Sequence, residues 1–245
     1  MIYSLWIFPS LALLPACWIV RSREIDRNYP FFSAFIYYSA AIYPLSLAVL
    51  IDFGPRAYTS LEIAIELVFY CLIAASLVEV GCDLFWPRRA QPAWVWRNML
   101  TLVAAGVAGT IVLADYVRPV NGGAISRIVL RIDQTAVGPA WVLSAVIFLY
   151  ALWVGRPFRR VNASISAGFV LLLTVDFAAT YIRATSSWPI AMAAAYIGQI
   201  AFTASVVLWA WMLRVGVPAW VRPNMSEVEY RLRLSRELMR IAESM

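Results

Sequence analysis

The residues best suited to chemistry are carboxylates and arginines that fall inside long apolar stretches of the sequence. Glu62 and Glu66 lie four residues apart, so both carboxylates face the same side of a helix. Asp176 precedes Arg183 by seven residues, which also places the two side chains on one helical face. An ionisable group near the centre of a bilayer costs at least about 2.5 kcal/mol, and it usually faces the bundle interior or a water-filled cavity. These residues therefore predict either a ligand or ion site or a set of buried ion pairs.

The candidate ligand-binding residues share one half of the predicted bundle. They are Glu62, Glu66, Asp115, Arg131, Asp133, Asp176, Arg183 and Gln199. The wider set in the same half also contains the acid Asp52 and the arginines Arg56, Arg118 and Arg127. The near balance of acids and arginines favours mutual ion pairing, in which Glu66 and Asp176 each have an arginine, Arg131 or Arg183, within reach. The other interpretation is a water-accessible vestibule that holds a ligand or an ion. The sequence leaves both interpretations open.

The composition excludes several kinds of catalysis. All 20 basic residues are arginine, and the chain contains no histidine. Without lysine there is no retinal Schiff base, and without histidine there is no imidazole ligand for haem or zinc and no His-activated nucleophile. The cysteines Cys17, Cys71 and Cys82 lack a C-x-x-C spacing and are expected to be small apolar side chains of helices. We therefore expect no enzyme, no metal and no cofactor.

The elements that position these side chains are apolar stretches long enough to cross a membrane. Hydrophobic residues make up 62% of the chain and charged residues 14%, against roughly 45–50% and 25% in soluble domains. A bilayer core about 30 Å thick needs about 20 apolar residues in a helix. The predicted spans are 2–20, 31–51, 61–82, 99–117, 132–154, 163–182 and 189–213. The fold class is thus an all-α polytopic membrane protein with seven transmembrane helices.

The arginines predict an orientation for this bundle. They cluster in the first, third and fifth connections and after the last span, as Arg21, Arg23, Arg27, Arg88, Arg89, Arg97, Arg156, Arg159, Arg160, Arg214, Arg222, Arg231, Arg233, Arg236 and Arg240. The positive-inside rule then places the N-terminus outside and the C-terminus in the cytoplasm. The connection 83–98, which carries Trp94 and Trp96 between arginines, is predicted to lie in the membrane interface. Within the spans, Ala105 with Gly109, Ser164 with Gly168 and Ala194 with Gly198 have the small-x-x-x-small spacing of close helix contacts.

The C-terminal segment predicts a separate short helix. Ser226 and Glu229 match a capping box. Beyond it, Leu234, Leu238 and Ile241 form an apolar stripe. Such a helix lies on the anionic inner leaflet or docks a cytoplasmic protein partner through Ser226–Met245. We divide the chain into a transmembrane bundle at 1–215 and a cytoplasmic tail at 216–245, and we expect no nucleic-acid partner.

The spacing of several features resembles a family of uncharacterised bacterial seven-helix integral membrane proteins. The features are the Arg-x5-Tyr-Pro stretch Arg23–Pro30, the glutamate-bearing third span with its arginine-rich loop, and the segment Leu130–Gln134. The resemblance implies a multi-pass protein of the bacterial inner membrane and no particular chemistry. Seven spans with an outside N-terminus also resemble the membrane halves of seven-helix sensor proteins.

The function predicted from these features is that of a non-enzymatic membrane receptor, sensor or accessory subunit. Its outer polar cluster would bind a small ligand, and its tail would contact a cytoplasmic protein. One alternative is a small-solute or ion transporter, which needs a polar path across the whole bundle, and the inner half offers little beyond Glu79 and Ser76. The second alternative is a purely structural or assembly role in the membrane.

Overall fold

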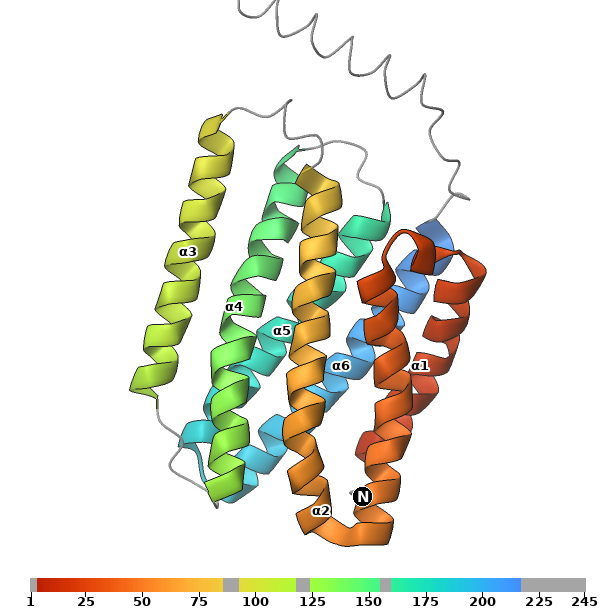
Figure 1. Ribbon diagram of the computed structural model, residues 1–245, viewed down its shortest axis with the longest axis vertical. Coiled ribbons are helices and arrows are strands. Elements are labelled where there is room, and N and C mark those ends of the chain that lie inside the picture. Colours follow the sequence, from red (N-terminus) through yellow and green to blue (C-terminus); the bar gives the residue numbers. More distant parts are fainter. Residues whose placement is uncertain (1–3, 86–92, 118–123, 155–159, 217–245) are drawn as a thin grey trace, which may run out of the picture.

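The computed structural model describes residues 4–85, 93–117, 124–154 and 160–216, and within these ranges all regular structure is helical. The chain forms a bundle of long helices that run in alternating directions (Figure 1). The elements are α1 (Ser4–Ser22), the 3₁₀ helix η1 (Ile25–Arg27), α2 (Pro30–Phe85), α3 (Ala93–Tyr116), α4 (Ala124–Val154), α5 (Arg160–Thr185) and α6 (Trp188–Gly216). The predicted all-α fold class is confirmed for this part of the chain. The predicted tail helix Ser226–Met245 lies outside the described residues.

Helix α2 consists of two antiparallel arms that meet at Gly54. Its first arm is Pro30–Gly54 and its second arm contains Leu61–Cys82. Gly54 has φ 78° and ψ 179°, a conformation that essentially only glycine adopts, because a Cβ would clash with the backbone. We call the end of the bundle at this bend the Gly54 end, and the opposite end, where α1 passes into η1, the Ser22 end (Figure 1).

The packing order of the helices leaves α3 at the edge of the bundle. Helix α5 packs against α4 and α6, α1 packs against α2 and α6, and α2 also contacts α4. Helix α3 packs mainly against α4. The helices that surround the bundle interior near the Gly54 end are therefore α2, α4, α5 and α6.

The outer surface of the bundle is apolar. Five helical segments are long and apolar enough to cross a membrane: Pro30–Gly54, Leu61–Cys82, Arg127–Tyr150, Val161–Thr185 and Trp188–Arg214. Two shorter apolar helices are Ile7–Ser22 and Leu100–Tyr116. Large apolar side chains such as Leu14, Val112 and Ile200 are more than 60% exposed on this surface. An apolar surface of this extent is typical of a helical protein that spans a membrane.

Two contacts show how small residues bring helices together. A Cβ on Gly168 of α5 would collide with the indole of Trp209 on α6, and the Trp209 Nε1–H donates to the Ile165 carbonyl over 3.2 Å. Gly168 thus serves the close contact predicted for it. The predicted contact at Gly109 is wrong, because a Cβ there would have no neighbour within 4 Å; in α3 it is Gly106 that packs, against Val142. Gly106 lies three residues before Gly109, on the face of α3 turned toward α4.

Helices α3 and α4 begin six or more residues before the spans that the sequence predicts. Helix α3 starts at Ala93, so the segment predicted to lie in the membrane interface already belongs in part to a helix. Helix α4 starts at Ala124, before the predicted start at 132. Its first turns extend past the end of α3, where Arg131 donates to the Ala114 carbonyl and Gln134 donates to the Val117 carbonyl. These side chains satisfy carbonyls that the end of a helix leaves without partners.

Candidate functional site

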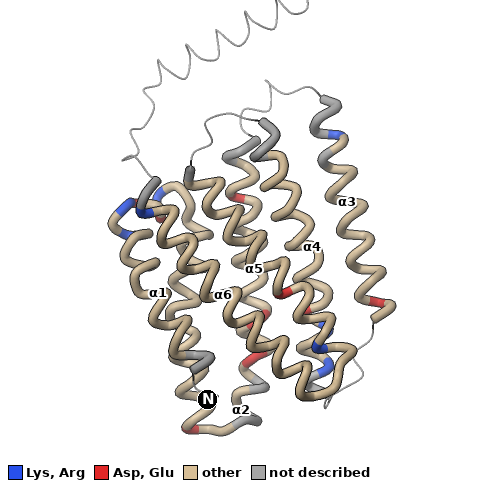
Figure 2. Tube along the Cα trace, turned by 180° about the vertical axis from the view of Figure 1, so that it is seen from behind, with Lys and Arg blue, Asp and Glu red and all other residues tan. Residues whose placement is uncertain are grey.

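A cavity of about 250 Å³ lies between α2, α4, α5 and α6 in the half of the bundle near the Gly54 end, and it is partly open. Its polar lining residues are Tyr43, Ser46, Tyr58, Glu62, Glu66, Tyr70, Asp133, Asp176, Arg183 and Gln199. Apolar and small residues complete it: Ile42, Ile65, Phe69, Leu172, Ala179, Ala194, Ala195, Gly198 and Phe202. Most of the acidic positions of the bundle gather in this half (Figure 2).

Six of the candidate residues line this cavity: Glu62, Glu66, Asp133, Asp176, Arg183 and Gln199. Spans far apart in the sequence therefore bring together the groups that the sequence singled out. The other two candidates lie elsewhere, between α3 and α4. Arg131 Nη2 donates to Asp115 Oδ1 over 2.6 Å, and the Asp115 side chain is 74% exposed. This pair connects two helix ends and does not contribute to the cavity.

Among the described residues, one ion pair lies inside the cavity. It joins α4 to α5. Arg183 Nη2 donates to Asp133 Oδ2 over 2.6 Å and also contacts Thr180 Oγ1 at 3.3 Å. Asp133 is only 3% exposed. The pair is incompletely satisfied, because Asp133 Oδ1 and Arg183 Nε are buried without a hydrogen-bond partner. A buried polar atom without a hydrogen-bond partner is costly, because it has lost its hydration. Such atoms therefore often mark the position of a ligand or an ordered water.

The remaining carboxylates of the cavity have no arginine partner. Asp176 Oδ2 accepts a hydrogen bond from the Tyr70 hydroxyl over 3.0 Å. Glu62 and Glu66 make no hydrogen bond or ion pair with the described residues. The predicted pairing of Glu66 with Arg131 is wrong, since Arg131 binds Asp115 outside the cavity. The predicted pairing of Asp176 with Arg183 is also wrong, because Asp133 takes the guanidinium.

Aromatic side chains, which are not among the candidate residues of the sequence, form the walls between these carboxylates. Tyr58 lies four residues after the bend at Gly54. Tyr43 lies beside the Gln199 amide. Burial raises the pKa of the Tyr58 phenol, and the nearby carboxylates Glu62 and Glu66 raise it further. The phenol therefore stays protonated at neutral pH and can donate a hydrogen bond. The sequence contains one signal that Tyr58, Phe69 and Tyr70 share a site with the glutamates. Each of them lies one or two helical turns from Glu62 and Glu66, and so falls on the same face of the helix.

Packed aromatic rings close the cavity toward the Ser22 end. Phe69 and Phe202 line the cavity, with their ring centroids 6.1 Å apart. Phe35, which is fully buried, lies 5.2 Å from Phe69 and 5.8 Å from Trp209. Trp209 in turn packs at 5.0 Å against Phe169. We call Phe35, Phe69, Phe169, Phe202 and Trp209 the aromatic floor.

Polar groups beyond the aromatic floor are engaged with the helices themselves. The Glu79 carboxylate accepts from the backbone amides of Phe31 and Phe32, at 3.3 and 3.1 Å, and so caps the first arm of α2. The Ser76 hydroxyl donates to the Leu72 carbonyl over 2.6 Å. The sequence offers these two residues to a transport path, but these contacts stabilise α2 instead.

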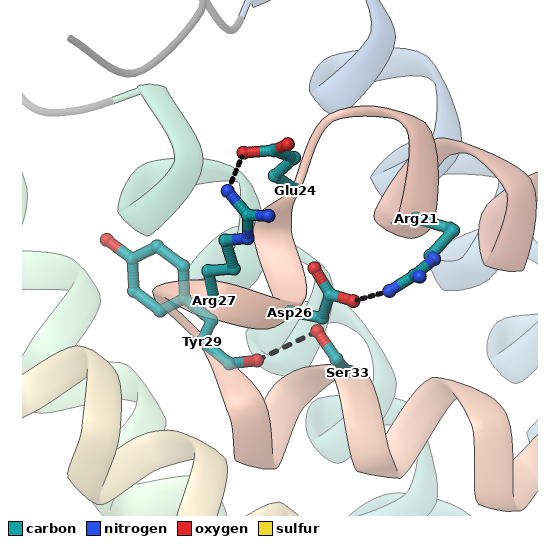
Figure 3. A network of polar contacts seen from close by, with 6 residues as sticks. All are labelled: Arg21, Glu24, Asp26, Arg27, Tyr29 and Ser33. Atoms are coloured by element: carbon teal, nitrogen blue, oxygen red, sulfur yellow. Dashed lines mark hydrogen bonds and ion pairs between the residues drawn. The ribbon is translucent and has the colours of Figure 1, made fainter.

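The Ser22 end is held by a network of short polar contacts (Figure 3). Arg21 binds Asp26 at 2.9 Å, and Arg27 binds Glu24 at 2.7 Å. The Ser33 hydroxyl donates to the Tyr29 carbonyl over 2.8 Å. The contacts lie within the turn from α1 through η1 into α2, and they fix that turn.

The groups that line the cavity offer charge, hydrogen bonds and aromatic faces. Among the described residues, no three His, Cys, Asp or Glu side chains are placed to hold a metal ion. The carboxylates are spread over three helices around a space, with aromatic rings between them. Comparison with protein-family models, with curated proteins and with solved structures found nothing that matches this chain.

Proposed function

We propose that this protein is a non-enzymatic, receptor-like integral membrane protein whose cavity binds a small ligand from outside the cell. The observation that carries the proposal is a cavity in which Glu62 and Glu66 have no hydrogen-bond or ion-pair partner among the described residues, above a floor of packed aromatic rings. Pairing of every charge would have supported a purely structural role. Ligand sites in helix bundles typically lie between helices and combine an apolar lining with a few convergent polar groups.

The proposal includes a topology of seven spans with the N-terminus outside and the C-terminus in the cytoplasm of a bacterial inner membrane. The two arms of α2 and the five other long helices supply the spans, and α1 and α3 have the shorter apolar cores. The arginines Arg21, Arg23 and Arg27 at the Ser22 end support a cytoplasmic location for that end. Trp18 and Trp188, which are exposed near opposite ends, fit the aromatic belts at the two membrane surfaces.

A receptor-like role is favoured over transport because the path below the cavity is blocked. A transporter of ions or solutes needs polar groups in sequence across the bundle. Here the aromatic floor lies next to the cavity, and the glutamate beyond it, Glu79, caps a helix. The tail at 216–245 would pass the signal to a cytoplasmic protein.

Cysteine accessibility tests the proposal directly. Cys17, Cys71 and Cys82 are first replaced by alanine, and a single cysteine is then introduced at Ala195 in the cavity or at Ser205 on the same helix. Ser205 is fully buried, so it serves as the matched control. In spheroplasts treated with a membrane-impermeant thiol reagent, Ala195→Cys should be labelled and Ser205→Cys should not.

The two positions separate the competing functions. Labelling of Ala195→Cys only after the cytoplasmic face is exposed would reverse the proposed orientation. Labelling of Ser205→Cys from either side would reveal a passage through the bundle and favour the transporter. If Ala195→Cys reacts from neither side, no accessible cavity exists and the receptor-like role is wrong.

A further inference from the structure

We propose that the ligand of this cavity is a small organic cation, an amine in its ammonium form or a quaternary ammonium. The inference rests on the proposed function, because it names the ligand class of the same cavity. Three features of the cavity support it: the excess of acidic over basic side chains, the aromatic lining and the volume.

The cavity carries an excess of negative groups. Four carboxylic acids line it, Glu62, Glu66, Asp133 and Asp176, and the one arginine among the lining residues is bound to Asp133. Among the described residues, the other three acids therefore have no cation at ion-pair distance. A carboxylate removed from water is costly unless a positive charge or hydrogen bonds compensate it. A cationic ligand would supply that compensation, whereas an anion would meet three acids and a guanidinium whose Nη2 already donates to Asp133.

A second observation is an unsatisfied polar atom in a residue that lines the cavity. Asp133 is 3% exposed and lines the cavity, yet its Oδ1 has no hydrogen-bond partner. Its other oxygen, Oδ2, is held by Arg183, so the orientation of the carboxylate is fixed. An ammonium group that donates to Oδ1 would satisfy this atom and join α4 to the glutamates of α2.

The walls favour an organic cation over a bare metal ion. Tyr43, Tyr58, Phe69, Tyr70 and Phe202 surround the space between the carboxylates. The face of an aromatic ring carries partial negative charge and attracts an ammonium group within about 6 Å of its centroid. A metal ion prefers several oxygen ligands gathered at one point, and no three acidic side chains of the described residues are so placed.

The size of the cavity limits the ligand to a compact molecule. Its volume of about 250 Å³ lies just below the roughly 300–1,000 Å³ range of ligand pockets. Small residues of α5 and α6 make the room: Ala179, Ala194, Ala195 and Gly198 all line it. A Cβ on Gly198 would lie 3.9 Å from Asp176 Oδ1, so the absent side chain leaves space directly beside a carboxylate.

Calorimetric titration of the purified full-length protein in nanodiscs tests the ligand class. The probes are benzylammonium and tetramethylammonium, with benzyl alcohol as the neutral match for benzylammonium and sodium ions as a bare cation. We expect saturable binding of at least one ammonium probe, and no binding of benzyl alcohol or sodium. Glu66→Gln should weaken ammonium binding about tenfold or more, because it removes a charged partner. Asp115→Asn, which changes an acid outside the cavity, should leave the affinity unchanged.

The outcomes distinguish this inference from the proposed function. If neither ammonium probe binds, if benzyl alcohol binds equally well, or if Glu66→Gln retains full affinity, the ammonium ligand is wrong. In those cases labelling of Ala195→Cys from outside would still support an outward cavity for another ligand. Tetramethylammonium cannot donate a hydrogen bond from nitrogen, so binding of benzylammonium alone would assign the dominant contact to Asp133 Oδ1 and the other carboxylates instead of the ring faces.

Discussion

The two ends of the bundle use similar residues in opposite ways. At the Ser22 end, acids have partners: Glu79 caps α2, Asp26 binds Arg21, and Glu24 binds Arg27. At the Gly54 end, Glu62 and Glu66 face a cavity and bind no described residue. A carboxylate inside a membrane-type bundle is therefore available to a ligand only where the neighbouring helices leave space beside it.

The difference comes from the residues between the helices and not from the number of charges. Toward the Ser22 end, the large side chains of Trp209, Phe169 and Phe32 are fully buried and packed on one another. Toward the Gly54 end, α5 and α6 present small residues such as Ala179 and Gly198, and these leave the interior hollow. Large aromatic rings thus close one half of the bundle, and small side chains open the other.

The largest effect is expected at the buried ion pair of the cavity. Arg183→Leu leaves Asp133 buried without its partner, and breaking such a pair costs about 3–5 kcal/mol. Adding Asp133→Asn should recover much of this loss, because no buried charge is then stranded. Thermal unfolding in detergent for a double-mutant cycle of these two residues measures the coupling.

The exposed pair Asp115–Arg131 is the control for that cycle. Because the Asp115 side chain is 74% exposed, its coupling with Arg131 should stay within about 0–1 kcal/mol. Equal coupling in the two cycles would mean that the cavity is as wet as the protein surface, and the contrast between the two sites would be lost.

A smaller effect on thermal stability is expected when glycines of the two halves of the bundle are replaced by alanine. Gly168 lies in the half packed with aromatic rings, and Gly198 lines the cavity. Gly168→Ala forces a Cβ into the Trp209 indole, and overpacking of this kind costs about 1–3 kcal/mol. Gly198→Ala places its Cβ at ordinary contact distance from Ala179 and Asp176, so its thermal stability should not fall. A stability loss at Gly198 equal to that at Gly168 would contradict the open space inferred beside Asp176.

The sequence predicted the helices and the charged residues of the cavity for a clear physical reason. An apolar stretch of about 20 residues predicts a membrane-spanning helix whatever its neighbours are. Ionisable residues inside such a stretch are rare, so they are easily recognised as candidates. Glu62, Glu66, Asp133, Asp176, Arg183 and Gln199 were found in this way, and the structure brings them together.

The partners of those residues could not be predicted, because pairing depends on how helices are rotated and shifted against one another. Arg131 and Asp133 are two residues apart, yet α4 points the first toward the end of α3 and the second into the bundle. Depth alone made Arg131 a reasonable partner for Glu66, and rotation of the helix excluded it. The tyrosine walls were missed because aromatic residues are frequent throughout this sequence and mark no site by themselves.

The smallest effect compares a glutamate that has a structural partner with one that has none. Glu79→Ala removes the acceptor for the amides of Phe31 and Phe32, and loss of a helix cap costs about 0.5–2 kcal/mol. Glu62→Ala removes a carboxylate that binds no described residue, so the unfolding temperature should stay the same or rise. Both are glutamates of the second arm of α2, so the change in helix propensity is the same in the two variants. Thermal unfolding of the two variants under identical detergent conditions measures the difference. A larger loss for Glu62→Ala than for Glu79→Ala would show that the acids of the cavity are structural, and the comparison between the two ends would then have to be reversed.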